Sequence, residues 1–125
     1  MDLMRIAIAT DFPGGLNAKV SSHFGECDIF TIVEIVPKNY GYGINKVELI
    51  PNKDHLNCGI PILKLKKAGA NIVIVQQIGK RPFEILQKEK IPVYIGNGIV
   101  RQVIQNYFEN RLFQATTENI CVHSV

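Results

Sequence analysis

Cysteine is scarce in this sequence, which contains only Cys27, Cys58 and Cys121 and no Cys-x-x-Cys pair. An odd cysteine count in a chain without a secretory signal argues against a disulfide framework, because such frameworks form in oxidising compartments. The cysteines are therefore expected to be free thiols, metal ligands or buried core residues. The missing Cys-x-x-Cys pair also argues against zinc-ribbon and treble-clef sites.

Long apolar runs and strong charge are lacking as well. No apolar run approaches the roughly 20 residues that a membrane helix needs. The first residues, MDLMRIAIAT, show neither the basic start nor the cleavage site of a secretory signal. The net charge is only +3, and the lysines and arginines are dispersed, unlike the clustered charge of a nucleic-acid-binding face. We therefore expect a cytoplasmic protein that binds neither membranes nor nucleic acid.

Catalytic motifs are also missing. The sequence contains no Gly-x-Ser-x-Gly, no Walker A sequence and no Gly-x-Gly-x-x-Gly. Asp11 could serve a divalent-metal hydrolase together with Glu26, Asp28 or Asp54, but a two-metal nuclease needs several converging carboxylates. These acids form no recognisable arrangement. We expect a protein that is not an enzyme, with hydrolysis at Asp11 as an alternative.

The remaining sequence has the pattern of one α/β domain. Its 125 residues are 46% hydrophobic and 20% charged, an ordinary globular balance. Alternation and β-branched residues predict strands at 4–10, 28–36, 44–50, 71–76 and 91–96. Helical spacing, with proline near two starts, predicts helices at 60–69, 81–90 and 99–112.

The order β-β-β-α-β-α-β-α predicts a five-stranded mixed sheet with helices on both faces. Strands one, four and five would be parallel through right-handed crossovers. Strands two and three would form a hairpin, and strand three would be an exposed edge through which two copies could pair as a homodimer. The domain spans residues 1–112, and the tail 113–125 fits either a short extra strand around Ile120 to Val122 or a loose end.

The predicted strand directions place several loops at one edge of the sheet. SSHFGECD, at residues 21–28, and HLNC, at 55–58, would both lie at the carboxyl edge, where open α/β sheets bind ligands. Imidazole and thiolate suit zinc, iron–sulfur clusters or copper better than magnesium or calcium. The candidate metal ligands are His23, Cys27, His55 and Cys58. Equally, the two cysteines fit small buried residues, and His23 fits a residue bonded to a loop carbonyl.

The turn IGKRP, at residues 78–82, is expected at the same edge. Gly79 precedes a predicted helix, so free amide groups, the positive end of the helix dipole and the cations Lys80 and Arg81 would form an anion site. An ordinary strand-to-helix turn is the alternative interpretation. A small regulatory module that binds a phosphate-containing ligand at Gly79 is a second functional hypothesis.

Four stretches carry a family resemblance, namely MRIAIATD, VSSHFGECDIFTIVE, GANIVIVQQIGKRPFEIL and IPVYIGNGIVRQVIQNYFENRL. The sequence resembles the dinitrogenase iron-molybdenum cofactor biosynthesis family, which includes NifX, NafY and the C-terminal domain of NifB. The resemblance covers roughly residues 4–112. Ser21 or Ser22, followed by His23, Phe24 and Gly25, matches the family's Ser-x-His-Phe-Gly element. Residues 77–81 match its Gly-Ile-Gly-x-Arg turn, with Gln77 in place of the first glycine.

The resemblance implies a ribonuclease-H-like fold without nuclease activity. It implies binding, carriage or insertion of an iron–sulfur or iron–molybdenum precursor cluster, held by His or Cys at the loop edge. Lys80 and Arg81 would balance the negative charge of the cluster. The partners would be proteins that donate or accept it. The chain has no radical-enzyme domain of the NifB kind, and stand-alone members also occur where no nitrogenase is made, which leaves the cargo open.

Overall fold

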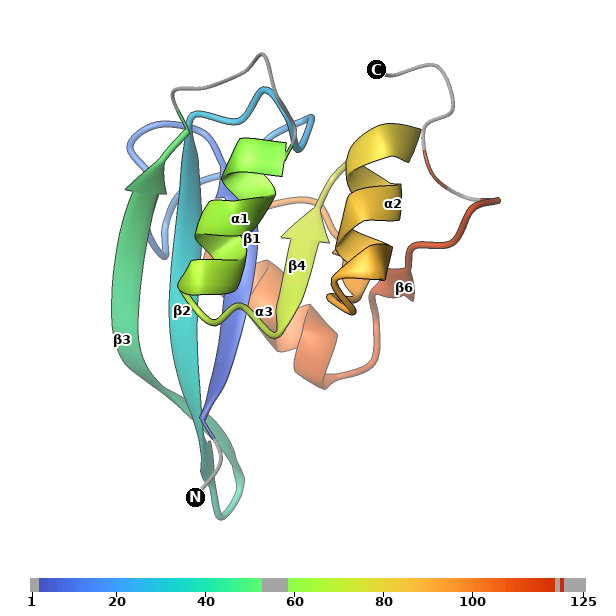
Figure 1. The fold of residues 1–125 in the computed structure, drawn as a ribbon. Helices are drawn as coiled ribbons and strands as arrows, with labels where there is room; N and C mark the ends of the chain where they lie inside the picture. Colours follow the sequence, from blue (N-terminus) through green and yellow to red (C-terminus); the bar gives the residue numbers. More distant parts are fainter. Residues whose placement is uncertain (1–2, 53–58, 119, 121–125) are drawn as a thin grey trace.

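The computed structural model describes residues 3–52, 59–118 and 120 (Figure 1). The chain forms, in order, β1 (Met4–Thr10), β2 (Ile29–Lys38), β3 (Gly41–Pro51), α1 (Gly59–Lys67), β4 (Ile72–Val75), α2 (Lys80–Lys88), β5 (Val93–Ile95), α3 (Val100–Phe108) and β6 (Phe113–Gln114). The hairpin is longer than its sequence predicts, because β2 and β3 continue through most of the turn-rich segment 37–43.

The strands form one mixed sheet in the order β3-β2-β1-β4-β5-β6. β1, β4 and β5 are parallel, whereas β2 runs antiparallel to both β1 and β3. The predicted hairpin, the parallel crossovers and the edge position of β3 are therefore confirmed. The fold class, an α/β mixed sheet with three helices, is confirmed too.

The predicted strand count of five is wrong, because the chain returns to the sheet after α3. Asn110, at a left-handed φ of 58°, lies in the turn that ends this helix. β6 then pairs antiparallel with β5, with Phe113 opposite Ile95. A two-residue strand is too short to show an alternating pattern, so its sequence gives no signal. Ile120, where the notional tail strand was expected to begin, is buried outside any strand; the rest of that segment lies outside the described residues.

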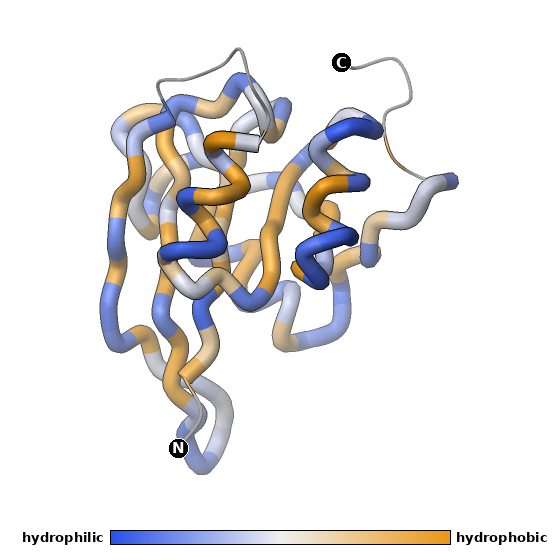
Figure 2. The backbone as a smooth tube through the Cα atoms, viewed as in Figure 1, coloured by the Kyte–Doolittle hydropathy of each residue, from blue (hydrophilic) through white to orange (hydrophobic). Residues whose placement is uncertain are grey.

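Helices cover both faces of the sheet, as predicted. α1 and α2 pack on one face and α3 on the other (Figure 1). Side chains alternate along β1, so Ala7 and Ala9 join the α1–α2 layer while Ile6 and Ile8 join the α3 layer. The apolar colouring of the central strands follows this two-sided burial (Figure 2).

The sequence also predicts that no helix spans a membrane and that the fold is ribonuclease-H-like. Within the described part of the chain, no helix has both the length and the apolar character needed to span a bilayer. The assignment to the ribonuclease-H-like folds stays a prediction.

Candidate functional site

The carboxyl ends of β1, β4 and β5 meet at one edge of the sheet, the upper edge in Figure 1. The hairpin brings the end of β3 to the same edge, because β3 is antiparallel to β2. A long loop, residues 11–28, crosses this edge between β1 and β2. The turns before α2 and α3 lie beside it. This loop and these turns make up the candidate site, as the strand directions predict.

Backbone hydrogen bonds near His23 join the loop to the sheet and to both neighbouring turns. The amide of Ser21 donates to the carbonyl of Ala9 in β1 at 2.8 Å. The amide of Val20 donates to Gly98 in the β5–α3 turn, also at 2.8 Å. The amide of Phe24 donates to Gln77 in the β4–α2 turn at 3.1 Å. The segment that carries His23 is therefore joined to both neighbouring turns.

His23 lies between two of these attachment points. Its neighbour Phe24 is fully buried and packs against Phe30 of β2, with ring centroids 5.2 Å apart. The His23 side chain itself is half-buried and forms no hydrogen bond or ion pair with the described residues. Its imidazole is thus free to bind a ligand at the edge, next to the β4–α2 turn.

Cys27 faces the interior. Its side chain is fully buried in the core under α1 and α2. Burial raises the pKa of the Cys27 thiol from 9.0 to about 12, because the thiolate would lose its hydration; the Asn52 amide, 3.8 Å from Sγ, only partly opposes this. A metal binds the thiolate rather than the thiol. The predicted ligand role of Cys27 therefore conflicts with its environment, and a core role fits it better.

His55 and Cys58, the other two predicted ligands, lie outside the described residues. Where side chains are described, no group of three or more His, Cys, Asp or Glu is close enough to hold a metal ion. Asp28, an acid considered for hydrolysis with Asp11, accepts a hydrogen bond from the amide of Phe12 at 2.9 Å. Two of the four candidate ligands, His23 and Cys27, are described, and of these only His23 is not buried.

The turn before α2 carries two adjacent cations, Lys80 and Arg81. Gly79 is the N-cap, with extended backbone (φ −74°, ψ 164°), and no side chain caps the helix. The side chains of Lys80 and Arg81 are exposed and take part in none of the ion pairs among the described residues. The helix dipole and these two cations give this end of α2 a positive charge.

The start of α3 differs, because the loop closes it. The amide of Val100 donates to Ala18 at 2.9 Å, and that of Arg101 donates to Leu16 at 3.0 Å. No side chain caps this helix either, and its N-cap residue is Ile99.

Asn52 organises the loop, although its sequence context does not single it out. It is buried, and its side-chain amide donates to the carbonyls of Gly25 at 3.3 Å and Cys27 at 3.0 Å. Its position directly after a strand is the one sequence signal for this role, because asparagine at such positions commonly forms hydrogen bonds to nearby backbone groups. Its bonding partners, however, lie 25 or more residues away in the sequence.

Replacing Asn52 by alanine is expected to lower the free energy of unfolding by about 1–3 kcal/mol, because buried carbonyls lose their donor. Urea unfolding followed by circular dichroism measures this. Asn97→Ala, at an exposed position on the same edge, is the matched control and should change stability by less than about 0.5 kcal/mol. Equal effects from the two variants would show that the Asn52 bonds do not stabilise the loop.

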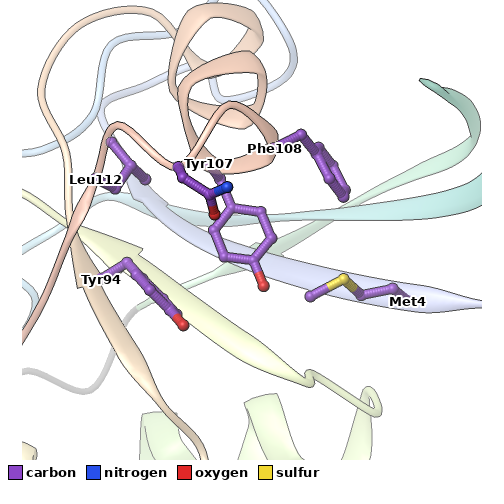
Figure 3. Close-up of a pocket in the computed structure, with 6 residues that line it drawn as sticks. Met4, Tyr94, Tyr107, Phe108 and Leu112 are labelled. Carbon is purple, nitrogen blue, oxygen red and sulfur yellow. The ribbon is translucent and has the colours of Figure 1, made fainter.

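A separate hollow of about 300 Å³ lies on the α3 face of the sheet, away from this edge (Figure 3). Met4, at the start of β1, and the aromatic rings of Tyr94, Tyr107 and Phe108 line it. Because β1 begins at the opposite edge of the sheet from the loop, this hollow is not part of the candidate site.

Comparisons with known proteins agree on the family. The model of the family described as dinitrogenase iron-molybdenum cofactor matches residues 4–110. A protein of Methanocaldococcus jannaschii described as uncharacterized is 30% identical over 115 residues, which cover 88% of this chain and 90% of that protein.

Solved structures share the fold. A Thermotoga protein provisionally described as NifB superposes with a TM-score of 0.72 and 26% identity, covering 91% of this chain and 95% of that one. The apo form of the orange protein from Desulfovibrio gigas gives a TM-score of 0.72 and 24% identity, covering 92% and 95%. Because the family model spans nearly the whole described chain, this protein belongs to the dinitrogenase iron-molybdenum cofactor family.

Proposed function

We propose that this protein binds and carries an iron–sulfur or iron–molybdenum-type precursor cluster at the carboxyl edge, without catalysing a reaction itself. The observation that carries the proposal is the juxtaposition of His23 with the basic start of α2, joined by the Phe24–Gln77 hydrogen bond. The family points to handling of the iron-molybdenum cofactor. The cluster is cargo, so a donor protein would supply it and an acceptor would receive it, in the cytoplasm.

The chemistry of the edge suits an anionic cluster. Lys80, Arg81 and the dipole of α2 supply positive charge, and neither cation is in an ion pair with an acid of the described residues. An imidazole such as that of His23 can ligate iron. Hydrogen bonds and charge around a cluster tune its stability and potential. In this arrangement Cys27 packs in the core beneath the loop and does not ligate the cluster, while Cys58 and His55 stay predicted ligands.

The phosphate-binding alternative uses the same turn and the same positive charge. None of the relatives described above favours it, whereas the family favours a metal-containing cargo.

The proposal is tested by anaerobic titration with ferrous iron and sulfide, with and without molybdate. After desalting, the wild-type protein should retain iron and show visible charge-transfer absorption. His23→Ala should lose most of this absorption, whereas Cys27→Ala, if folded, should retain it. Protein that holds no iron above a buffer control under any of these conditions would contradict the proposal.

Removing the two cations at α2 is expected to weaken cluster binding by about tenfold or more, since each loses an attraction of about 1 kcal/mol to an anion at the helix end. The double variant is Lys80→Ala/Arg81→Ala, measured by the same titration. Lys64→Ala/Lys67→Ala removes the same charge from the last turn of α1, at the opposite edge, and is the matched control. Equal loss in both variants would indicate a nonspecific effect of net charge.

A further inference from the structure

β3 forms an open edge of the sheet (Figure 1). Its inner side pairs with β2 along Gly41–Pro51, and no strand of the described chain lies against its outer side. Two apolar side chains, Val47 and Leu49, are 37% and 47% exposed there. An open edge with exposed apolar residues is a template for pairing with another strand.

One half of this edge is protected against pairing with another strand, and the other half is not. Lys46 lies opposite Glu34 of β2, but the next residue of β2, Ile35, lies opposite Ile44. Asn45 is therefore an extra, bulged residue in β3. Bulges hinder edge-to-edge pairing because they bend the strand. From Lys46 onward the pairing with β2 is regular. The unprotected edge is therefore the segment 46–50.

The direction of the backbone groups in this segment follows from one hydrogen bond. The amide of Asn52 donates to Asp28 at 3.0 Å, which marks these two residues as a hydrogen-bonded pair. Backbone groups alternate in an antiparallel ladder, so those of Lys46 and Glu48 also point toward β2. Those of Val47 and Leu49 point outward and are available to another strand.

We propose that β3 pairs antiparallel with β3 of a second copy of this chain, with Val47 on the two-fold axis. Such a contact uses the same surface on both copies. Val47 would exchange both outward backbone hydrogen bonds with Val47 of the second copy. Lys46 would then lie directly opposite Glu48 of the second copy, and Glu48 opposite its Lys46. The sheet would continue through both chains.

Charge selects this register over its neighbours. A two-fold axis must pass through a residue pair, because only residues with matching backbone direction can face each other. With the axis at Lys46, two lysines would face each other, and with the axis at Glu48, two glutamates would. Like charges directly opposite destabilise a strand pair, whereas opposite charges stabilise it. The Val47 register makes two opposite-charge pairs.

The same register covers the exposed apolar side chains. Val47 lies opposite Val33 of β2 and Leu49 opposite Thr31, so both point to the α3 face, where Val33 belongs to the core. Across the axis, Val47 would meet Val47 of the second copy, with Leu49 at the diagonal position within contact range. The ion pairs would lie on the other face.

In this register only residues 46–48 of each copy pair regularly, because Leu49 falls opposite the bulged Asn45 of the second copy. With so short a segment the interface falls below the roughly 1,200 Å² of stable complexes, and the dimer should depend on concentration. Antiparallel pairing leaves the carboxyl edge of each copy open. The dimer does not depend on cluster binding, so its failure and that of the proposed function are distinguishable.

Sedimentation velocity tests the proposal at protein concentrations from about 10 µM to about 500 µM, the range that brackets weak interfaces of this size. The wild type should pass from the 14.0 kDa monomer to twice that mass. Lys46→Glu alone should stay monomeric, because each copy then presents two facing carboxylates. Glu48→Lys alone should stay monomeric because two facing ammonium groups repel.

An equimolar mixture of Lys46→Glu and Glu48→Lys should form heterodimers, since every facing pair in the mixed dimer then joins opposite charges. The double swap Lys46→Glu/Glu48→Lys should restore self-association. Lys67→Glu, on exposed α1 surface, controls for net charge and should behave as wild type. Because Lys46→Glu also adds a carboxylate opposite Glu34, circular dichroism must confirm the fold of every variant that contains it, and Glu48→Lys carries the test if these do not fold.

A wild type that stays monomeric up to the highest concentration overturns the proposal. Single charge reversals that dimerise as the wild type does overturn it as well. A mixture and a double swap that both stay monomeric rule out the Val47 register.

Discussion

Replacing Phe24 by alanine is expected to lower the free energy of unfolding by about 3–5 kcal/mol, the usual cost of a large-to-small change at a buried phenylalanine. Phe24 is fully buried, and its ring packs against Phe30. It also anchors the loop beside His23 through its amide bond to Gln77. Since small domains have only about 5–15 kcal/mol of stability in total, the variant should be close to unfolding at 37 °C. Urea unfolding at 25 °C measures the change.

Phe12→Ala is the matched control, because it removes the same side chain from the same loop at a position 77% exposed. We expect a change of less than about 0.5 kcal/mol there. At temperatures where Phe24→Ala is still folded, it should also bind the iron–sulfide probe more weakly than Phe12→Ala, because the His23 segment is no longer held. A Phe24→Ala variant as stable as Phe12→Ala would mean that the loop does not depend on this anchor.

Most of the fold could be predicted from local pattern. The four consecutive buried residues of β4 and the alternation of β1 indicate their strands directly. The helices are also predicted, although they end earlier than their periodicity suggests: α3 stops at Phe108, and the apolar Leu112 beyond it packs against the α3-side core instead. Periodicity marks which residues are buried and cannot tell a helical residue from one that packs after the helix.

The candidate site was harder to predict than the edge that carries it. Strand direction is enough to bring His23 and the α2 turn together. The direction of each side chain is not predictable in the same way, because residues 21–28 have no regular period. Ser21, Phe24 and Cys27 point inward, whereas His23 is half-exposed. Two contacts decide this, the packing of Phe24 on Phe30 and the hydrogen bond from Asn52 to the Cys27 carbonyl, and both form only when the loop folds against the sheet.

The direction of Cys27 also changes how the edge balances charge. A thiolate there would add negative charge inside the core, close to Asp28 and Asp11, whose charges further raise its pKa. Two cations of the edge that form no ion pair with the described residues, Lys80 and Arg81, lie instead on α2. A cluster bound at the α2 end would therefore be attracted by Lys80 and Arg81 without requiring a charged Cys27. The reactivity of the Cys27 thiol then measures whether this residue is a buried core residue or an accessible ligand.

In the folded protein, Cys27 is expected to react with a thiol reagent such as DTNB at pH 8 at least about 1,000-fold more slowly than in urea. Its pKa rises from 9.0 to about 12 on burial, and three units reduce the thiolate fraction by that factor, before the effect of limited access. The measurement uses Cys58→Ser/Cys121→Ser, in which Cys27 is the only thiol. The same variant in urea gives the unprotected rate.

The same shift predicts a pH dependence of stability. The folded state holds the Cys27 proton more tightly than the unfolded state, so this group leaves stability unchanged below about pH 9. Stability then falls as the pH rises from 9 toward 12, where the unfolded chain loses the proton first. Cys27→Ala should lose less stability than its parent over this interval. Rapid labelling of folded Cys27, with no difference between the two alkaline profiles, would instead mean that the loop opens readily and presents the thiolate, which would restore Cys27 as a cluster ligand.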